Sequence, residues 1–189
     1  MYLSKKILLP LALVAIAFAS WGFISTPAEN AQPDIAAEIN WVSVEEAAAA
    51  AEKDGKKILI DMYTDWCGWC KRMDASTYVD PGVVKYVNDN YHAVKFDAES
   101  KEAVTINGVT YKYNSKIGRR GVHELAVQIL NGKLSYPTTS FLNPDLSILT
   151  NVAGFQQADA MMVILSFLGE DHYKNVSWED YQKFYDQGE

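Results

Sequence analysis

The sequence predicts an α/β domain in which strands and helices alternate along the chain. Short apolar runs bounded by turn signals indicate buried strands, and apolar residues at intervals of three and four indicate helices. The part of the chain that follows the N-terminal segment holds about 160 residues, which is enough for one domain with its own core.

The N-terminal segment, residues 1–28, is interpreted as a targeting element rather than as part of the fold. Lys5 and Lys6 give it a positive start, and an apolar run over 7–24 follows without a charged residue. This pattern favours a secretory signal peptide. The run also reaches the lower length limit of a bilayer span, so a retained anchor through residues 7–24 is the alternative. Either way, the rest of the chain is expected to be exported to the periplasm, soluble after cleavage or anchored by this segment.

Residues 29–39 are expected to form a flexible leader, and each later helix is predicted from its start and stop signals. Ser43 and Glu46 form a capping box that opens an Ala-rich helix, which Gly55 ends. The pair Asp80-Pro81 supplies an N-cap and a first-turn proline for another helix. The other helices are expected from Cys67, within 122–130 before Gly132, from Gln157, and from Ser177 through Phe184 in a C-terminal helical extension of residues 171–189.

Strands are predicted where apolar and β-branched residues gather between turn signals. They are expected at 57–63, 91–97, 138–142 and 147–153. Residues 103–113 alternate around Asn107-Gly108, a dipeptide that favours a two-residue hairpin turn. The chain is therefore expected to add a hairpin and a helix before the strand at 138–142.

Net charge excludes one class of partner. The chain carries a formal net charge of −7 and no cluster of basic residues. A protein that binds nucleic acid normally presents a basic patch to the phosphates. Nucleic acid is therefore not an expected partner.

The two cysteines of the chain are the strongest functional signal. Cys67 and Cys70 stand directly after the strand at 57–63, at the start of a helix. A Cys-x-x-Cys pair at such a junction is a redox arrangement, because helix N-terminal N–H groups stabilise a thiolate. Exported domains stapled by disulfides usually carry several scattered pairs, and a loop this short constrains the chain little. The pair is therefore interpreted as chemical rather than structural.

Other roles for the cysteines fit the sequence less well. A zinc site normally needs four ligands, and the chain offers only three scattered histidines besides the cysteines. Haem attachment requires histidine directly after the second cysteine, where Lys71 stands. A buried, unreactive pair is the remaining alternative.

Three motifs in order along the chain resemble those of thioredoxin-like proteins. Residues 58–71 resemble the strand and active-site segment of that family, with Asp61 and Trp66 where the family has an acid and a tryptophan. Tyr136-Pro137-Thr138 resembles the family's cis-proline segment, and Ala153-Gly154-Phe155 resembles the turn before its last helix.

The resemblance implies a thioredoxin fold over about residues 40–170, with a central mixed β-sheet flanked by helices. A hairpin–helix insertion over about 100–132 would precede the cis-proline. The chain departs from the family's pattern in Gly68-Trp69 between the cysteines. It also has no clear match for the lysine that partners the buried acid, since Lys95 is nearby but is expected to be out of register.

The resemblance also implies a role for each residue at the site. Cys67 would be the exposed nucleophile, and Cys70 would resolve the mixed disulfide, so that the redox disulfide is Cys67–Cys70. Asp61 would accept the proton of Cys70 and would have a pKa raised by burial. A hydrated or backbone-bonded Asp61 at a strand end is the alternative.

The substrate would bind along Tyr136 and a cis Pro137, beside Trp66 and Trp69. Simple packing of the two tryptophans on the surface is an equally weighted alternative. The neighbouring pair Arg119-Arg120 is interpreted as solvated loop charge.

The implied function is an exported thiol–disulfide oxidoreductase that reduces protein disulfides. Its partners would be disulfide-containing protein substrates and a dithiol electron donor, with no metal and no organic cofactor required. The alternative is a protein-binding module of thioredoxin fold in which the Cys-x-x-Cys pair is incidental.

Overall fold

The structure is a computed structural model that describes residues 38–186. The predicted signal or anchor segment and most of the predicted leader lie outside the described residues. Ile39, at the predicted end of the leader, is buried in the core. Among the described residues, no helix is long and apolar enough to cross a membrane.

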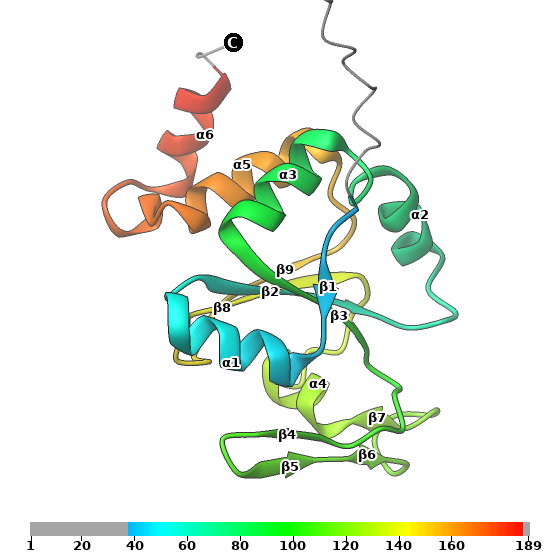
Figure 1. The fold of residues 1–189 in the computed structure, drawn as a ribbon. Coiled ribbons are helices and arrows are strands. Elements are labelled where there is room, and N and C mark those ends of the chain that lie inside the picture. The colour runs from blue at the N-terminus through cyan, green and yellow to red at the C-terminus, as the bar shows by residue number, and fades with distance from the viewer. Residues whose placement is uncertain (1–37, 187–189) are drawn as a thin grey trace, which may run out of the picture. The chain divides into compact units, whose positions relative to one another are not determined.

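A mixed five-stranded sheet forms the centre of the domain (Figure 1). Its strands, in spatial order, are β1 (Trp41–Val42), β3 (Tyr91–Asp97), β2 (Lys57–Tyr63), β8 (Thr138–Leu142) and β9 (Ile148–Ala153). β1, β3 and β2 run parallel, whereas β8 and β9 are antiparallel to their neighbours. The predicted strands at 57–63, 91–97 and 138–142 are confirmed, and the predicted mixed sheet with them. β1 was missed because two residues are too few to show a period.

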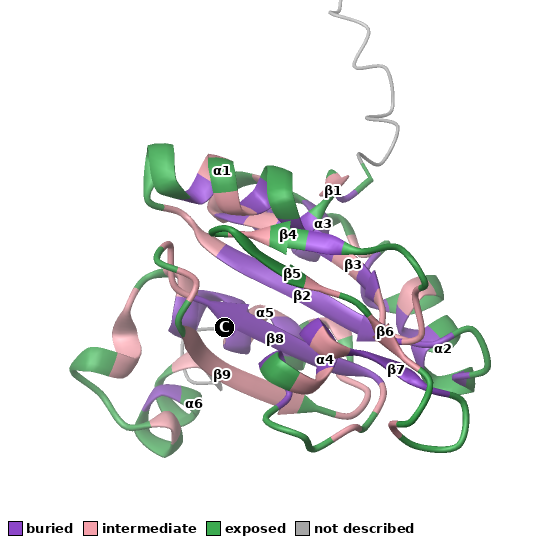
Figure 2. Ribbon diagram, turned by 90° about the horizontal axis from the view of Figure 1, so that it is seen from below, coloured by how far each residue is buried: buried purple, intermediate pink, exposed green. Residues whose placement is uncertain are grey.

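Helices cover both faces of this sheet, as the sequence predicts. The helices are α1 (Val44–Asp54), α2 (Gly68–Ser76), α3 (Pro81–Asn90), α4 (Glu124–Ile129), α5 (Ala158–Gly169) and α6 (Trp178–Asp186), with a 3₁₀ turn at His172–Lys174. One core cluster packs α3 and α5 on one face, and a second packs α1 and α4 on the other. Figure 2 shows the buried strands β2 and β8 between these layers.

Side-chain alternation along β2 assigns Asp61 to a face. Leu59 belongs to the cluster under α3 and α5, whereas Ile58 and Ile60 belong to the cluster under α1 and α4. Because strand side chains alternate, Asp61 points to the same side as Leu59. Asp61 pairs with Lys95 across β2 and β3, so Lys95 shares that face. Lys95 is therefore in register with the acid, and the prediction that it would be out of register is wrong.

The helix ends follow the predicted signals. Ser43 and Glu46 form the capping box of α1, and Gly55 ends that helix in the left-handed conformation at φ 75°. The Asp80 carboxylate accepts hydrogen bonds from Gly82 N and Val83 N at the start of α3. At the other end of the chain, the Tyr181 hydroxyl of α6 donates to Ser166 Oγ of α5 at 3.0 Å.

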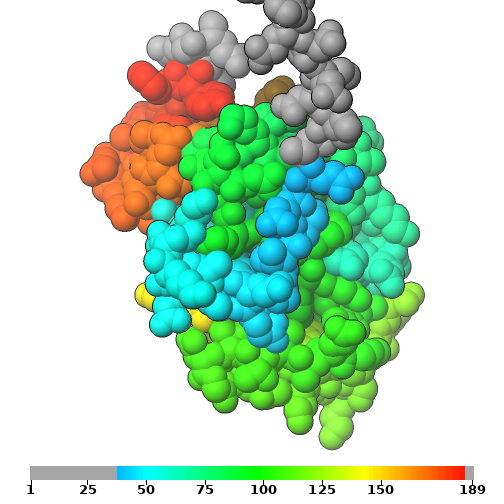
Figure 3. Space-filling model, viewed as in Figure 1, coloured from blue at the N-terminus to red at the C-terminus, as the bar shows by residue number. Residues whose placement is uncertain are grey.

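The insertion consists of two hairpins and α4. β4 (Val104–Ile106) and β5 (Val109–Tyr111) flank the predicted Asn107-Gly108 turn. A second hairpin, β6 (Tyr113–Asn114) with β7 (Val122–His123), was not predicted. Figure 3 shows the insertion gathered at the end of the domain beneath α1.

The second strand of this hairpin lies where a helix was expected to begin, and His123 is both the last residue of that strand and the N-cap of α4. His123 is fully buried, and its Nδ1 accepts a hydrogen bond from Leu125 N at 3.2 Å as the N-cap of α4. Its own backbone N–H donates to the Ala98 carbonyl at 2.8 Å. These bonds attach the insertion to the end of β3.

Candidate active site

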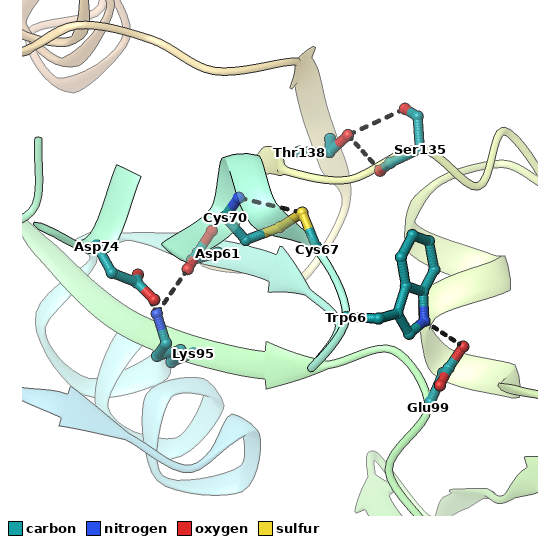
Figure 4. Close-up of a disulfide and its surroundings, with 9 residues drawn as sticks. All are labelled: Asp61, Trp66, Cys67, Cys70, Asp74, Lys95, Glu99, Ser135 and Thr138. Carbon is teal, nitrogen blue, oxygen red and sulfur yellow. Dashed lines mark hydrogen bonds and ion pairs between the residues drawn. A yellow bond between two sulfur atoms is a disulfide. The ribbon is translucent and has the colours of Figure 1, made fainter. Parts of the chain in front are cut away.

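The two cysteines lie where the end of β2 turns into α2. Cys67 is the N-cap of α2, and its Sγ accepts a hydrogen bond from Cys70 N at 3.1 Å. The two sulfurs are joined in a disulfide (Figure 4). An N-cap acceptor satisfies a free N–H group at the helix start and is favoured there when it carries negative charge. The geometry therefore favours the thiolate of Cys67 once the disulfide is reduced.

The exposure of Cys67 differs from the prediction. An exposed nucleophile was expected, but Cys67 is 5% exposed and Cys70 is 2% exposed. The reason is local: the Cys67 side chain turns back over the helix end to meet Cys70. Both cysteines of the oxidised protein are thus largely covered by the rest of the domain.

Asp61 lies beneath the disulfide as a buried carboxylate (Figure 4). It is 1% exposed, and its Oδ1 has no hydrogen-bond partner among the described residues. Burial raises the pKa of Asp61 to about 6, although the Lys95 ammonium opposes that shift. Figure 4 shows the carboxylate between Lys95 and Cys70. A carboxyl group with this pKa can both hold and release a proton near neutral pH.

Lys95 bridges two carboxylates that come from different elements. Its Nζ lies 3.1 Å from Asp61 Oδ2 of β2 and also contacts Asp74 Oδ1 of α2. Burial alone would lower the pKa of Lys95, but the two carboxylates outweigh burial and raise it. The ammonium also lies 5.0 Å from the centre of the Tyr63 ring. Lys95 therefore connects the sheet to the helix that bears the cysteines.

Pro137 follows a cis peptide bond, which confirms that part of the sequence prediction. Its carbonyl accepts a hydrogen bond from Gly154 N at 2.8 Å. On the other side of the same segment, the Tyr136 ring lies 6.1 Å from the Trp66 ring in an edge contact. The segment thus lies between the residues near Gly154 and those near Trp66.

The insertion contributes to one wall beside the disulfide. Trp66 is 54% exposed, and its Nε1 donates to Glu99 Oε1 at 2.9 Å. The guanidinium of Arg120 lies 5.8 Å from the centre of the Trp66 ring. Arg120 is an exposed turn residue, as expected of a solvated loop charge, and it also lies over the Trp66 ring.

The second wall comes from α2 and from the turn before α5. Trp69 is 58% exposed and lies 5.6 Å from the Phe155 ring. Arg72 lies over both rings, 5.4 Å from Trp69 and 5.6 Å from Phe155. Both tryptophans thus remain exposed while making specific contacts, which suits a surface that receives another chain.

Sequence reasoning missed the roles of Lys95, Asp74, Glu99 and Arg72 at this site. Two of these had a usable signal. Lys95 is the fifth residue of its strand, as Asp61 is of β2, so aligning the two parallel strands pairs them. Arg72 is three residues after Trp69 on a helix, a spacing that brings side chains together. Glu99 comes from a loop whose path has no such periodicity.

Comparisons with known proteins agree with this geometry. The model of the Thioredox_DsbH family, described as a protein of unknown function, DUF255, matches residues 31–175. Thiol:disulfide interchange protein DsbD of Citrobacter koseri is 33% identical over 94 residues, which are 47% of this chain and 16% of that protein. The DsbD of Escherichia coli (strain K12) is 31% identical over 94 residues, with the same coverage. The chain therefore matches less than a fifth of these relatives' length.

Solved structures show the fold. A DsbH oxidoreductase superposes with a TM-score of 0.53 at 18% identity, covering 71% of this chain and 86% of that one. A thioredoxin from Thermus thermophilus superposes with a TM-score of 0.52 at 18% identity, covering 70% and 88%. The chain thus has the thioredoxin fold, and the predicted fold class is confirmed.

We predict that Asp61→Asn removes a pH dependence of stability. With a pKa of about 6, folded Asp61 keeps its proton at pH values where the unfolded chain has lost it. This contribution is fully favourable below pH ~4 and is lost as the pH rises through ~6, with a total of about 3 kcal/mol. The variant should therefore be more stable than the parent at pH 7, by up to about 3 kcal/mol, and similar to it at pH 4. Urea unfolding of the oxidised proteins between these pH values measures the difference.

Asp65→Asn is the matched control, because Asp65 is an exposed carboxylate in the same segment. In that variant the free energy of unfolding should depend on pH as it does in the parent protein. If the free energy of unfolding of Asp61→Asn also kept the pH dependence of the parent, the buried carboxyl would not be the group that titrates.

Proposed function

The chain belongs to the Thioredox_DsbH family, and on this premise we propose that it is an exported thiol–disulfide oxidoreductase that reduces protein disulfides. The observation that carries the proposal is the Cys67–Cys70 disulfide at the start of α2, above the buried carboxylate of Asp61. The DsbD relatives, named thiol:disulfide interchange proteins, support the same class of chemistry over the matched region.

In the proposed mechanism, the Cys67 thiolate attacks one sulfur of a substrate disulfide. The substrate S–S bond breaks, one substrate sulfur leaves as a thiolate that takes up a proton, and a mixed disulfide forms on Cys67. Cys70 then transfers its proton to Asp61 and attacks Cys67 Sγ, which releases the second substrate thiol. The substrate gains two electrons and the protein is left with the Cys67–Cys70 disulfide. A partner dithiol then reduces that disulfide.

The residues that border the disulfide would receive the substrate. Pro137 and Tyr136 offer the edge of an irregular segment, and Trp66 and Trp69 stand exposed on its two sides. An extended peptide could lie between the tryptophans with its cysteine over the Cys67 sulfur. This arrangement supports a polypeptide substrate rather than only a small thiol.

Export of the chain is proposed from residues 1–28, whose positive start and apolar run are typical of a signal peptide. Retention of the same segment as an anchor is the other form of this proposal. Protease treatment of intact spheroplasts should digest the protein, whereas protection until lysis would contradict export. The mass of the mature chain distinguishes cleavage from anchoring.

The proposed activity is tested by reduction of insulin with dithiothreitol as electron donor. The parent protein should accelerate the reduction, and Cys67→Ser should lower the rate to that of dithiothreitol alone, because the attacking thiolate is lost. Cys70→Ala is the matched variant: it keeps the nucleophile and should accumulate a mixed disulfide with the substrate. Equal, uncatalysed rates for parent and Cys67→Ser would instead favour a binding module in which the cysteines are incidental.

We further predict a moderately reducing couple. No cation stands between the cysteines, where Gly68 and Trp69 lie, and the buried Asp61 disfavours a neighbouring thiolate. Lys71 and Arg72 are exposed on α2, which weakens their opposing effect. The potential should therefore lie nearer that of thioredoxin (about −270 mV) than that of strong dithiol oxidants (about −120 mV). Equilibration with a glutathione series measures it, and a value at the oxidising end would contradict a reductase.

A further inference from the structure

The wall formed by Trp69, Phe155 and Arg72 carries a positive charge that has no carboxylate partner among the described residues. The Arg72 guanidinium lies over both aromatic rings, at 5.4 Å and 5.6 Å from their centres. No ion pair joins Arg72 to a carboxylate within residues 38–186, where the observed pairs involve only lysine and histidine cations. Stacking on a ring uses the face of a guanidinium and leaves its N–H groups available at the edge. Arg72 is thus a held cation with free donors.

This cation is carried by the cysteine helix α2, two residues after Cys70. Trp69 stands between the two cysteines in the chain, and Phe155 directly follows Gly154, which bonds to the Pro137 carbonyl. Thr77, at the end of α2, donates its hydroxyl to the Gln156 carbonyl at 2.6 Å. These contacts hold the wall against both the cysteine helix and the cis-proline segment. A chain that is bound at the disulfide and passes Trp69 would bring its side chains toward Arg72.

A pocket of about 270 Å³ opens beside the same arginine. It is lined by Arg72, Ser76, Phe155, Gln157, Ala158 and Asp159. Asp159 lines the pocket without forming an ion pair with Arg72. The pocket therefore offers room for a small polar group next to unpaired guanidinium donors.

The opposite wall does not share this character. Arg120 lies over Trp66, but the Glu99 carboxylate accepts the Trp66 N–H in the same place. Asp65 and Asp97 add negative charge, since both contribute to raising the pKa of the neighbouring Tyr63 hydroxyl after burial. Arg120 forms no ion pair among the described residues either, but a carboxylate bound on the Trp66 side would also meet the negative charge of Glu99.

We propose that Arg72 forms a carboxylate-binding subsite, so that the protein prefers disulfides that carry a carboxylate next to the cysteine. The inference rests on the proposed exchange function and names its substrate class. The planar guanidinium fork suits a carboxylate, which it can bind with two parallel hydrogen bonds. The carboxylate belongs either to an acidic residue of a polypeptide or to a small thiol such as glutathione.

The test compares pairs of substrates that differ only in this charge. One pair is a cystine peptide with Glu beside the cysteine and its Gln counterpart; the other is oxidised glutathione and its glycyl ethyl ester. Reduction by the dithiol form of the full protein is followed by stopped-flow tryptophan fluorescence. The Glu peptide should react about three- to tenfold faster than the Gln peptide at low salt, with a smaller ratio at high salt.

In Arg72→Met, the ratio of the reduction rates of the Glu and Gln peptides should fall close to one. The substitution removes the charge and keeps an apolar side chain against the rings. Lys71→Met is the matched control: it removes an adjacent exposed cation of the same sign and should keep the ratio. Arg72→Lys should keep part of the ratio, since the charge remains but the fork is lost. Asp159→Asn should raise the ratio, because a competing negative charge leaves the pocket. Far-ultraviolet circular dichroism confirms that each variant is folded.

Each outcome supports or overturns the proposed carboxylate subsite at Arg72. A preference for the Glu peptide assigns the subsite to polypeptide side chains, and a preference confined to glutathione over its ester assigns it to a small thiol. Equal rates within both pairs, or the same loss of preference in Lys71→Met, would overturn the subsite while leaving the exchange function intact. Failure to reduce any disulfide, insulin included, would overturn the exchange function and the subsite together.

Discussion

A carboxylate in the middle of a sheet costs free energy unless a partner compensates it, and β2 carries such a group at Asp61. The compensation is incomplete, because Lys95 reaches only one of the two carboxylate oxygens. Burial therefore prevails and raises the pKa of Asp61 to about 6. The position of this group determines much else at the site, since the strand that buries it also delivers the cysteines at its end.

Lys95 makes the ionisation of the buried Asp61 and the position of α2 depend on each other. Lys95 contacts Asp61 below and Asp74 on α2, one helical turn beyond Cys70. Withdrawal of α2 would cost the ion pair between Lys95 and Asp74 and would change the charge around the buried acid. The disulfide-bearing helix is thereby fixed to the sheet by an electrostatic contact as well as by packing of Met73 in the core. Proton uptake at Asp61 and the geometry of the sulfurs are thus physically linked.

Local signals in the sequence predicted most helices and strands well, because apolar periodicity and capping residues lie within each element. The strands at 57–63 and 91–97 are bounded as expected, and Ser43, Gly55 and Asp80 act as the caps that their chemistry indicates. Errors arose where tertiary contacts decide. Val122 matches a helical period but lies in a strand, because it pairs with Asn114 of β6. Arg120 is the exposed turn residue that the sequence indicates, but its contact with the Trp66 ring has no signal in the neighbouring sequence.

The insertion has a consequence for how such a protein can diversify. Its hairpin at Arg120, and Glu99 just before the insertion, contact the site at Trp66. The sulfur chemistry, by contrast, resides in β2, β3 and α2, which the insertion joins at the end of β3. One part of the proposed recognition surface is therefore encoded apart from the sulfur chemistry, whereas Trp69 and Arg72 belong to the cysteine helix itself. Variation between β3 and β8 can remodel the surface beside Trp66 and, under the proposed function, redirect the protein to other partners, while the disulfide and Asp61 stay as they are.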